Sequence, residues 1–487
     1  MVSAVLFITF FVLLVLNVPI SICLGLSSAA AILYSGTSLT IVATNIYSGI
    51  SKFLLLAIPF FVLSGNIMAK AGISTRLIRF VDTCVGHRKG GIANVCIIVA
   101  CFFGAISGSG PATVAALGAV LIPAMVERGG FSAPFSTALM ATASSIAIVI
   151  PPSIAFVVYA SITGVSIGDM FMAGIVPGIL MGLALIVVVM LEVRKNHVVP
   201  SNVQKASAKE RLDAFKDAFW GFLMPVIILG GIYGGIFTPT EAAAVSVVYG
   251  LFVGMVIYKE VKLKDLWDIL IDSAKTTGGI MLIVACASLF SFVCTRFGIS
   301  AAASQLLAKV AGNQFTFLLI CNVIFLIAGC FIDANSAMYI FIPIMLPVCK
   351  QLGYNVIAFG IMATVNLAIG QVTPPVGVNL FVAIGIKLRD GIRVTLQEIS
   401  RAVVPMVAAS IVVLLIITYI PQISTCLPAA LGSAAAIENG ETAGGDSGTT
   451  QTDNDDFNTI GDYSDLDWAD MTWNFTCSTT ETSTWAQ

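Results

Sequence analysis

The chain has 487 residues, of which 58% are hydrophobic and only 10% are charged, and its mean hydropathy is +0.99. A soluble protein typically carries about 25% charged residues, so this composition excludes a soluble enzyme or binding domain and indicates an all-α polytopic membrane protein. The net charge is −2, but the segment after Pro428 has eleven acidic residues and no Lys or Arg, so the cations lie in the apolar part, where they indicate topology and not nucleic-acid binding.

Apolar stretches follow one another along the chain up to residue 424. A membrane-spanning helix needs roughly 20 apolar residues. We predict membrane segments over 2–16, 20–35, 53–69, 91–104, 114–126, 133–149, 154–165, 170–193, 219–237, 241–258, 277–295, 314–331, 337–349, 355–372, 376–386 and 401–424. The first has no preceding positive charge and no small-residue cleavage site, so we interpret it as a retained helix and not as a signal peptide.

Two of these apolar stretches are interrupted in the N-terminal half. The segment Ser107-Gly108-Ser109-Gly110-Pro111-Ala112-Thr113 lies inside 91–126, and Ile150-Pro151-Pro152-Ser153 lies inside 133–165. Gly allows unusual backbone angles, and Pro removes a donor and blocks a helix. We therefore predict a re-entrant helical hairpin over 91–126 and a helix over 133–165 that is broken at Pro-Pro.

The same two interruptions return in the C-terminal half. Asp333-Ala334-Asn335-Ser336 lies inside 314–349, and Thr373-Pro374-Pro375-Val376-Gly377 lies inside 355–386. Further matches occur in the same order, namely Ala141-Thr142 with Ala363-Thr364, and Ala71-Gly72-Ile73-Ser74 with Phe297-Gly298-Ile299-Ser300. A doubled set of interrupted hydrophobic segments indicates a secondary transporter and its binding site.

The distribution of cations predicts the topology. Basic residues gather in the loops 70–89, 194–216, 259–264 and 387–393, which we place in the cytoplasm, and they are sparse in 36–50, 161–169, 238–241 and 296–313, which we place outside. Both termini then fall on the outer side. The first hairpin starts and ends beside cytoplasmic cations and the second on the cation-poor side, which is the pattern of an inverted repeat.

The residues at the interruptions suit a hard cation. A helix that breaks within the membrane leaves carbonyl groups free at one end and N–H groups at the other. The carbonyl ends favour a cation such as Na⁺ and the N–H ends favour an anion. The loops offer oxygen but no sulfur or imidazole, so we expect no transition metal, and the chain has no P-loop for ATP.

Two acidic residues have competing interpretations. Asp333 is either a ligand of a cation or proton site or a helix cap that binds the N–H groups of Asn335 and Ser336, and both roles are compatible. Glu241 is interpreted first as part of a helix start, with Thr240 as the candidate N-cap.

The remaining segments carry less information. The cysteines of the apolar segments are interpreted as small buried hydrophobic residues, and only Cys426 and Cys477 are placed to form a disulfide. The residues after Pro428 are rich in Gly, Ser, Thr and Asp and predict disorder. The segment 299–312 has an amphipathic pattern and is expected to lie along the outer interface.

Several motifs together resemble one known family. Phe103 to Thr113, Ile150 to Ser153, Ile58 to Gly65, Gly234 to Ala242 and Gln371 to Gly377 are similar to the large membrane subunit, of the DctM type, of tripartite ATP-independent periplasmic (TRAP) transporters. The resemblance covers about residues 1–425 and leaves the acidic tail unassigned.

The resemblance implies a function and partners. A DctM subunit is not an enzyme; it is expected in the cell inner membrane with periplasmic termini, and it uses Na⁺ as coupling ion and no other cofactor. It would import an organic acid, such as a C4-dicarboxylate, sialic acid or a similar carboxylate, by an elevator movement in the lipid bilayer. A periplasmic substrate-binding protein would deliver the acid, and a small membrane subunit would be the second partner.

The resemblance also implies site residues. The Na⁺ sites would comprise Ser107, Gly108, Ser109, Ile150, Pro151, Asp333, Ala334, Asn335, Thr373 and Pro374. The substrate would contact Gly110, Pro111, Thr113, Pro152, Ser153, Ser336, Pro375, Gly377 and Asn379.

The expected division into domains follows the interrupted segments. We assign scaffold helices to 1–90, a first transport repeat to 91–165, and central scaffold helices to 166–313, with a cytoplasmic connector at 194–217 and an interfacial arm at 299–312. The second transport repeat is 314–386, a scaffold helix is 387–425, and the tail is 426–487.

Three other functions are compatible with an apolar helical chain. The main alternative is an ion-coupled anion transporter of a related hairpin family, which works without a binding protein. A neighbouring gene for a periplasmic binding protein would favour the TRAP transporter over this alternative. A membrane enzyme would need paired acids, His or a nucleophile at one depth. A passive channel would show flux that is independent of a Na⁺ gradient.

Overall fold

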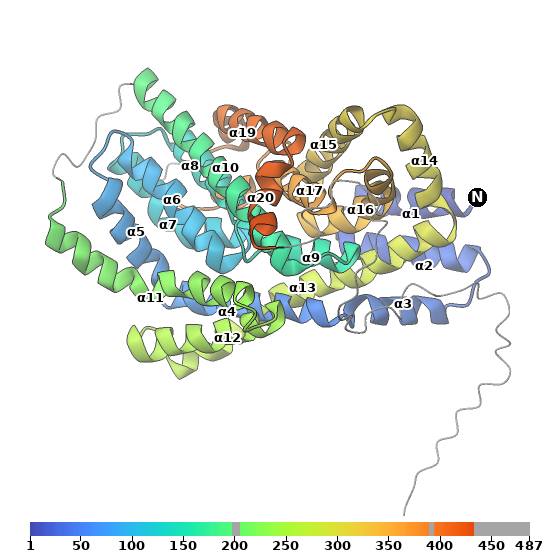
Figure 1. Cartoon of the computed structure of the whole chain (residues 1–487), viewed down its shortest axis with the longest axis horizontal. Coiled ribbons are helices and arrows are strands. Elements are labelled where there is room, and N and C mark those ends of the chain that lie inside the picture. Colours follow the sequence, from blue (N-terminus) through green and yellow to red (C-terminus); the bar gives the residue numbers. More distant parts are fainter. Residues whose placement is uncertain (197–204, 389–393, 433–487) are drawn as a thin grey trace, which may run out of the picture. The chain divides into compact units, whose positions relative to one another are not determined.

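The computed structural model describes residues 1–196, 205–388 and 394–432, and within these ranges the regular elements are helices (Figure 1). In the N-terminal half they are α1 Val2–Val15, α2 Ile20–Tyr34, α3 Thr40–Ile50, α4 Ala57–Lys70, α5 Ile73–Val85, α6 Gly91–Ser107, α7 Gly110–Glu127, α8 Ala133–Ser145, α9 Ile154–Thr163 and α10 Ile167–Asn196. In the C-terminal half they are α11 Ala208–Tyr233, α12 Pro239–Phe252, α13 Leu263–Arg296, α14 Ile299–Ala311, α15 Gln314–Phe331, α16 Ala334–Gln351, α17 Val356–Gly370, α18 Val378–Ile384, α19 Leu396–Tyr419 and α20 Gln422–Ala430.

Many of the helices are long and apolar enough to cross a bilayer. By length and composition, the described residues contain eight such helices: 53–70, 110–127, 167–195, 208–233, 239–257, 263–296, 314–331 and 396–419. The prediction of an all-α polytopic membrane protein is therefore confirmed.

The two hairpins and the two broken helices form as predicted. Helices α6 and α7 pack on each other and form the first hairpin, and α15 and α16 form the second. Each is followed by a long helix that stops at the Pro-Pro pair, α8 in the first half and α17 in the second, and by a short helix beyond it, α9 and α18.

Close helix crossings occur at equivalent places in both repeats. In the first repeat, a Cβ added to Gly104 of α6 would lie 2.7 Å from the Cα of Ala147. In the second, a Cβ added to Gly370 of α17 would lie 2.5 Å from the Cα of Gly329 on α15. Backbones approach this closely only where a side chain is missing, so the inverted repeat extends to the contact between hairpin and broken helix.

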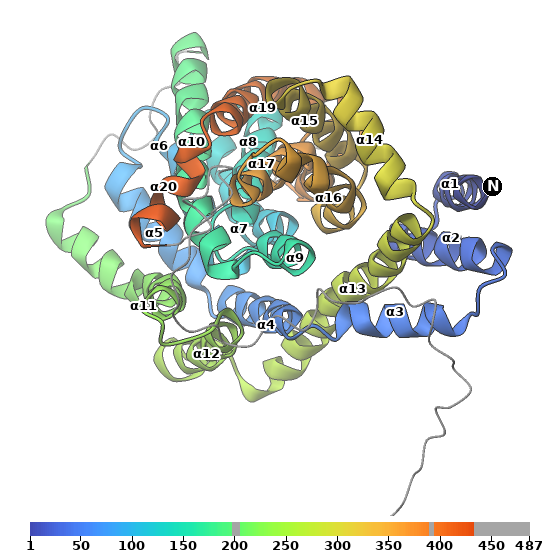
Figure 2. The same ribbon diagram turned by 45° about the vertical axis from the view of Figure 1, so that its right-hand side comes forward.

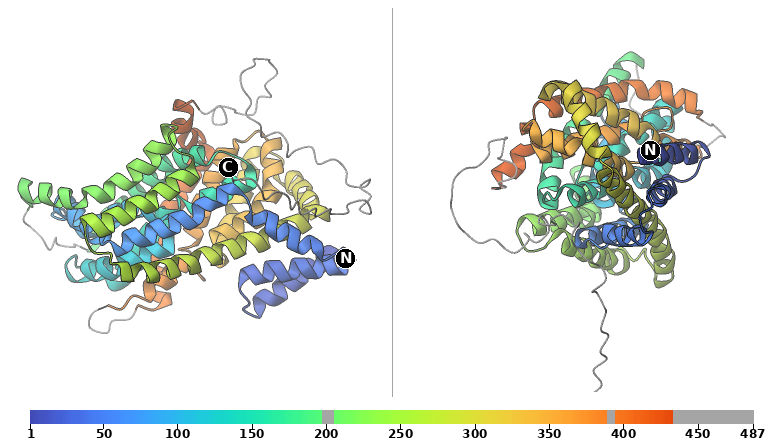
Figure 3. Two further views of the ribbon diagram at one scale, coloured as in Figure 1. Left: turned by 90° about the horizontal axis from the view of Figure 1, so that it is seen from below. Right: turned by 90° about the vertical axis from the view of Figure 1, so that its right-hand side faces the viewer.

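The helices pack in two groups that are joined at a few places (Figures 2 and 3). In one group α13 contacts α2, α3 and α4, and α12 contacts α4 and α11. In the other, α8 contacts α6, α7, α18 and α19, while α17 contacts α15, α16 and α19. Helix α10, which we expected among the scaffold helices, packs on α6, α17 and α19, and α19 packs on α8 and α17.

Two helices were missed because they are not continuously apolar. Residues 36–50 and 70–89 were predicted as loops, but the structure contains α3 and α5 there. Helix α5 is amphipathic: Ile73, Leu77 and Val81 recur every four residues and are buried, while the cations lie between them. A search for unbroken apolar runs overlooks this pattern.

The structure refines or corrects several predicted segments. The connector 194–217 is largely helical, because α10 continues to Asn196 and α11 begins at Ala208; its residues 197–204 lie outside the described ranges. Helix α20 reaches Ala430, so the first residues assigned to the tail are helical, and Cys477 and the rest of the predicted tail lie outside the described residues. The N-cap of α12 is Thr238 and not Thr240: its hydroxyl accepts from Glu241 N at 3.3 Å.

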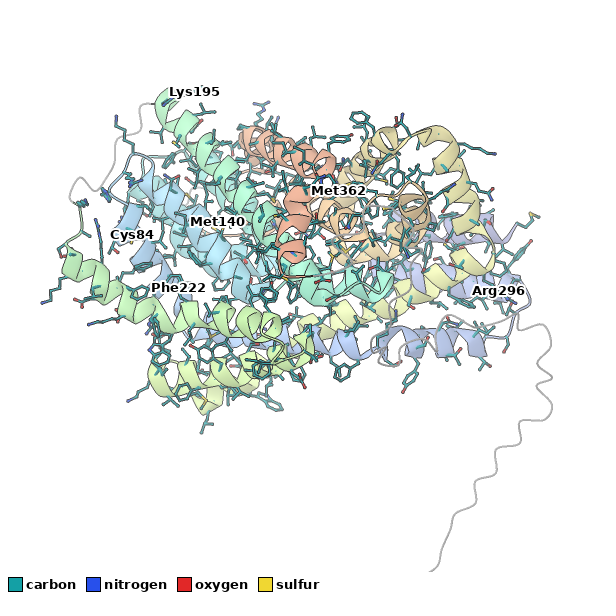
Figure 4. All side chains as sticks on the ribbon, in the orientation of Figure 1. Cys84, Met140, Lys195, Phe222, Arg296 and Met362 are labelled. Carbon is teal, nitrogen blue, oxygen red and sulfur yellow. The ribbon has the colours of Figure 1, made fainter. Side chains whose placement is uncertain are left out.

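The ends of the long helices carry cationic residues on both sides of the helical body. Figure 4 shows Lys195 and Cys84 toward one end of the helical body and Arg296 toward the opposite end. The cationic side chains around α5 also pair there, with Arg76 bound to Glu260 at 2.7 Å and Arg79 to Asp217 at 3.0 Å. These ion pairs connect α5 with α11 and with the loop before α13.

Candidate functional site

The tip of the first hairpin is fixed by its own hydroxyl groups. Helix α6 ends at Ser107, Gly108 is left-handed with φ 59°, and α7 starts after the extended Ser109. The Ser107 and Thr113 hydroxyls lie 2.9 Å apart, and Thr113 donates to Ser109 O at 2.8 Å. Thr113 is therefore a structural element of the tip, because its hydroxyl is buried and already bonded.

This tip packs directly on the first Pro-Pro turn. A Cβ added to Gly108 would lie 2.6 Å from Pro152 O, so only Gly fits. The fully buried Ser153 caps α9 by accepting from Phe156 N at 3.4 Å, and its hydroxyl also donates to Ile148 O. Its hydrogen-bonding groups are thus engaged with the protein in this structure.

The far end of α9 is held by other elements. Lys52, just before the span that contains α4, donates from Nζ to Ser161 O at 2.7 Å, and burial lowers the pKa of the Lys52 ammonium group. The Ser161 hydroxyl also lies 3.0 Å from the Tyr339 hydroxyl on α16. A cation at the C-terminal end of a helix is favourable for the helix dipole, so this contact stabilises α9.

The tip of the second hairpin is organised by Asp333. Its Oδ2 accepts from Asn335 N and Ser336 N, both at 3.1 Å, and its Oδ1 accepts from the Ser336 hydroxyl at 2.5 Å. Asp333 is therefore the N-cap of α16, one of the two roles predicted for it. The negative charge lies at the positive end of the helix dipole, so the second predicted role, as a cation ligand, is compatible with this geometry.

The second Pro-Pro turn brings two amide side chains into the interior. Gln371 and Asn379 flank the turn and are at most 5% exposed, and neither Gln371 Oε1 nor Asn379 Oδ1 has a hydrogen-bond partner. Asn379 N donates to Gln371 O at 3.1 Å, and Gly377 N donates to Cys330 O of the second hairpin at 3.3 Å. Buried amide oxygens without a partner are costly, which is typical of a site that receives a ligand.

The two repeats meet at Gly110. A Cβ added to this residue would lie 2.8 Å from Asn379 Nδ2 and 3.2 Å from Gln371 Oε1. The start of α7, in the first hairpin, is thereby packed against the second broken helix. The site is consequently shared between the repeats.

A cavity of about 400 Å³ opens where the tips meet α13. Its lining is Gly108, Ser109, Gly110, Pro111, Ile148, Ile154, Ala155, Lys275, Thr276, Gly279, Ile280, Ile283, Asp333, Ala334, Asn335 and Gln371. Ser107 lines a neighbouring cavity of about 120 Å³ between α4 and the first hairpin. Both hairpin tips thus face one space, as the repeat predicts.

The structure divides the predicted site residues into two sets. Seven of them, Gly108, Ser109, Gly110, Pro111, Asp333, Ala334 and Asn335, line the main cavity. The others do not line it: Ser107 lines the neighbouring cavity, and the rest lie in the two Pro-Pro turns or in the first turn of the helix that follows a tip or turn, namely Ile150, Pro151, Pro152, Ser153, Thr113, Ser336, Thr373, Pro374, Pro375, Gly377 and Asn379.

Sequence reasoning missed the α13 side of the cavity, and it included Gln371 only as the first residue of the motif Gln371 to Gly377. Lys275 and Thr276 stand just before the predicted apolar segment 277–295 and were not assigned a role. A lone cation beside an apolar segment was the only signal, and it does not distinguish a cavity from the membrane surface. Among the described residues, no group of three His, Cys, Asp or Glu side chains is placed to hold a metal ion.

Comparison with known proteins identifies the family of the chain. A family model described as the tripartite ATP-independent periplasmic transporter, DctM component, matches residues 7–423. The chain belongs to the DctM family. The C4-dicarboxylate TRAP transporter large permease protein DctM of Pseudomonas aeruginosa is 42% identical over 84% of this chain and 94% of that protein.

Other relatives of this DctM permease differ in their named substrates. The sialic acid TRAP transporter large permease protein SiaM of Vibrio cholerae is 34% identical over 82% of this chain and 92% of its own length. The isethionate TRAP transporter permease protein DctMQ of Oleidesulfovibrio alaskensis is 42% identical over 86% of this chain, but this chain spans only 65% of that protein. The YdaH transporter of Alcanivorax borkumensis has a similar fold, with a TM-score of 0.55 at 14% identity over 80% of this chain and 87% of that one.

Proposed function

We propose that this DctM permease uses a Na⁺ gradient to import an organic acid across the cell inner membrane. The observation that carries the proposal is the cavity that both hairpin tips share, which combines a carboxylate, hydroxyl groups and backbone of broken helices. Oxygen ligands without sulfur or imidazole suit a hard cation, and helix N-termini in the same space suit an anion. Na⁺ is such a hard cation, and the carboxylate of an organic acid is such an anion.

Two cation sites follow from the repeat. We place one between Ser107, Gly108 and Ser109 and the first Pro-Pro turn, and the other between Asp333 to Asn335 and the second. The Ser109 carbonyl, the Asp333 carboxylate and the unpartnered Asn335 Oδ1 supply oxygens at these tips. The supporting residues behind the cavity, such as Thr113 and Ser153, orient these groups through their hydrogen bonds.

The packing groups suggest which part moves. We propose that the hairpins, the broken helices, α10 and α19 move together, because α10 and α19 pack on them more extensively than on the other helices. This revises our expectation that α10 and α19 belong to the scaffold. Helices α1 to α4 and α11 to α13 form the fixed part, and the substrate crosses with the moving part as in an elevator.

The partners follow from the family. We propose a small membrane subunit beside the fixed helices and a periplasmic binding protein that delivers the acid, with both termini of this chain on the periplasmic side. The excess of cations near Lys195 and α5, at the end opposite Arg296, supports this orientation.

The test of Na⁺ coupling is thermal unfolding of the purified full chain with its small subunit in NaCl and in KCl at equal ionic strength. A ligand that binds only the folded state at 100 times its Kd stabilises it by about 2.7 kcal/mol. We expect a rise of the midpoint that depends on Na⁺, and a weaker rise after Ser107→Ala.

Two substitutions of Asp333 distinguish its role as a helix cap from its role as a cation ligand. Asn caps helices about as well as Asp, so Asp333→Asn should keep the midpoint in KCl and lose much of the response to Na⁺. Asp333→Ala should lower both the unfolding midpoint in KCl and the response to Na⁺. Equal midpoints in NaCl and KCl for the unmodified chain would overturn Na⁺ coupling and favour proton coupling through Asp333.

A further inference from the structure

Helix α13 has two differently packed halves. Its C-terminal half, from Val284 to Cys294, is largely buried, whereas most residues from Leu263 to Ile283 are exposed or half-buried, and the helix as a whole contacts α16 of the second hairpin. Figure 2 shows α13 passing beside α2, α3 and α4. The wall of the cavity opposite the first hairpin therefore belongs to the less buried half of α13.

Lys275 lies on this open wall. It lines the cavity together with the hairpin-tip residues Ser109, Gly110 and Asp333. Of the described residues in the lining, Lys275 is the only cation and Asp333 the only acid. The Asp333 oxygens already accept three hydrogen bonds from its own helix start, so its charge is partly compensated there.

The Lys275 ammonium group has only a loose partner. Its Nζ lies 3.7 Å from Asp272 Oδ1, and the two side chains are 73% and 70% exposed. Such an exposed pair one helical turn apart contributes little to stability. The ammonium group is thus free to exchange Asp272 for another oxyanion.

A polar group faces the cavity from the transport side as well. Gln371 is 5% exposed, and its Oε1 has no partner. Its amide offers a donor and an acceptor to a hydroxyl or acid group in the cavity. A small hydroxy acid or diacid therefore meets a fixed positive charge from α13 and a buried amide from the second broken helix.

We propose that Lys275 binds the acid group of the substrate, a carboxylate or a sulfonate, while the cavity faces α13. This rests on the proposed transport of an organic acid. Since α13 belongs to the fixed helices, the substrate meets Lys275 only in the state in which the tips lie beside it. Asp272 takes the ammonium group back when the acid leaves, which makes release possible.

A simpler role for Lys275 is anchoring at the membrane surface. Lysines next to apolar segments extend their amines toward lipid headgroups. Such a lysine would have no effect on the binding of a soluble anion. The two roles are thus separable by measuring occupancy of the cavity.

Gly279 and Gly278 provide matched positions for a reporter. A Cβ at either residue meets nothing within 4 Å, and both residues are exposed, but only Gly279 lines the cavity. We would introduce Gly279→Cys or Gly278→Cys into the full chain and measure its reaction with N-ethylmaleimide at constant Na⁺ and ionic strength. Succinate, isethionate and N-acetylneuraminate are the probes, and the chain without an introduced cysteine gives the background.

We expect at least one of the three anions to slow the reaction at Gly279→Cys and not at Gly278→Cys. Lys275→Met should raise the half-protecting concentration of that anion at least tenfold. Lys275→Arg, which keeps the charge, should stay within threefold. Lys264→Met, which removes a lysine from the same helix outside the cavity, should have no effect.

The outcomes distinguish this proposal from the proposed function. Protection that is equal in the Lys275→Met variant would overturn the role of Lys275 and leave organic-acid transport standing. Thermal stabilisation by Na⁺ without protection by any of the three anions would also overturn it and leave Na⁺ coupling standing. Absence of both responses would contradict the proposed function itself.

Discussion

Replacing Gly370 by Ala tests the contact that positions the second hairpin. An added Cβ would lie 2.5 Å from the Cα and 2.6 Å from the carbonyl carbon of Gly329, whereas ordinary contacts begin at 3.4 Å. The obstacle is backbone, so α15 and α17 must separate by nearly 1 Å. Overpacking of this kind costs about 1–3 kcal/mol, while the higher helix propensity of Ala returns up to about 1 kcal/mol.

We therefore expect Gly370→Ala to destabilise the chain by about 1–2 kcal/mol and to weaken its response to Na⁺, because the Asp333 tip shifts with α15. The assay is the thermal midpoint of the detergent-solubilised chain, in NaCl and in KCl. Gly278→Ala is the matched control, since its Cβ meets nothing within 4 Å and it should be neutral or stabilising. Equal midpoints and equal Na⁺ responses for the two variants would refute the reasoning.

Substitutions at three further positions test other parts of the fold by the same unfolding assay. Asn366→Ala removes the donor to Asn322 Oδ1 in the buried contact between α17 and α15, and we expect a loss of about 1 kcal/mol; an unchanged midpoint would mean that water replaces the bond. Arg76→Met breaks the half-exposed pair with Glu260, so the loss should stay below about 1 kcal/mol and shrink between about 0.1 and 1 M NaCl. A loss independent of salt would point instead to its ring contact with Tyr258 and its hydrogen bonds to Ala71 O and Gly72 O. Thr238→Ala should cost about 1 kcal/mol and Thr238→Asn much less, and equal losses would argue against capping.

The sequence predicted those parts of the fold that depend on local backbone chemistry. Gly108 and the Pro-Pro pairs interrupt apolar helices, so the first hairpin tip and both broken helices could be located from residue types, and the second tip from the polar run Asp333 to Ser336 inside an apolar stretch. Helix α5 could not be found from hydropathy, because its apolar residues occupy only one face.

The supporting and lining residues of the site could not be separated in advance. Ser153 and Ser109 have the same side chain and both flank an interruption, but one is fully buried as a cap and the other faces the cavity. That difference depends on which element packs against each residue. The contribution of α13 depends on contacts between distant segments, which local sequence patterns do not report.

On the proposed elevator movement, the unequal burial along α13 gives a length for the transport stroke. The stretch from Val284 to Cys294 is largely buried, and the part of α13 that lines the cavity runs from Lys275 to Ile283. A straight helix rises about 1.5 Å per residue, so these nine positions measure about 14 Å. If the moving helices travel until this wall is covered, each transport cycle carries the acid by that distance. Cross-linking of cysteines placed along α13 to a cysteine on a hairpin tip would measure the distance travelled.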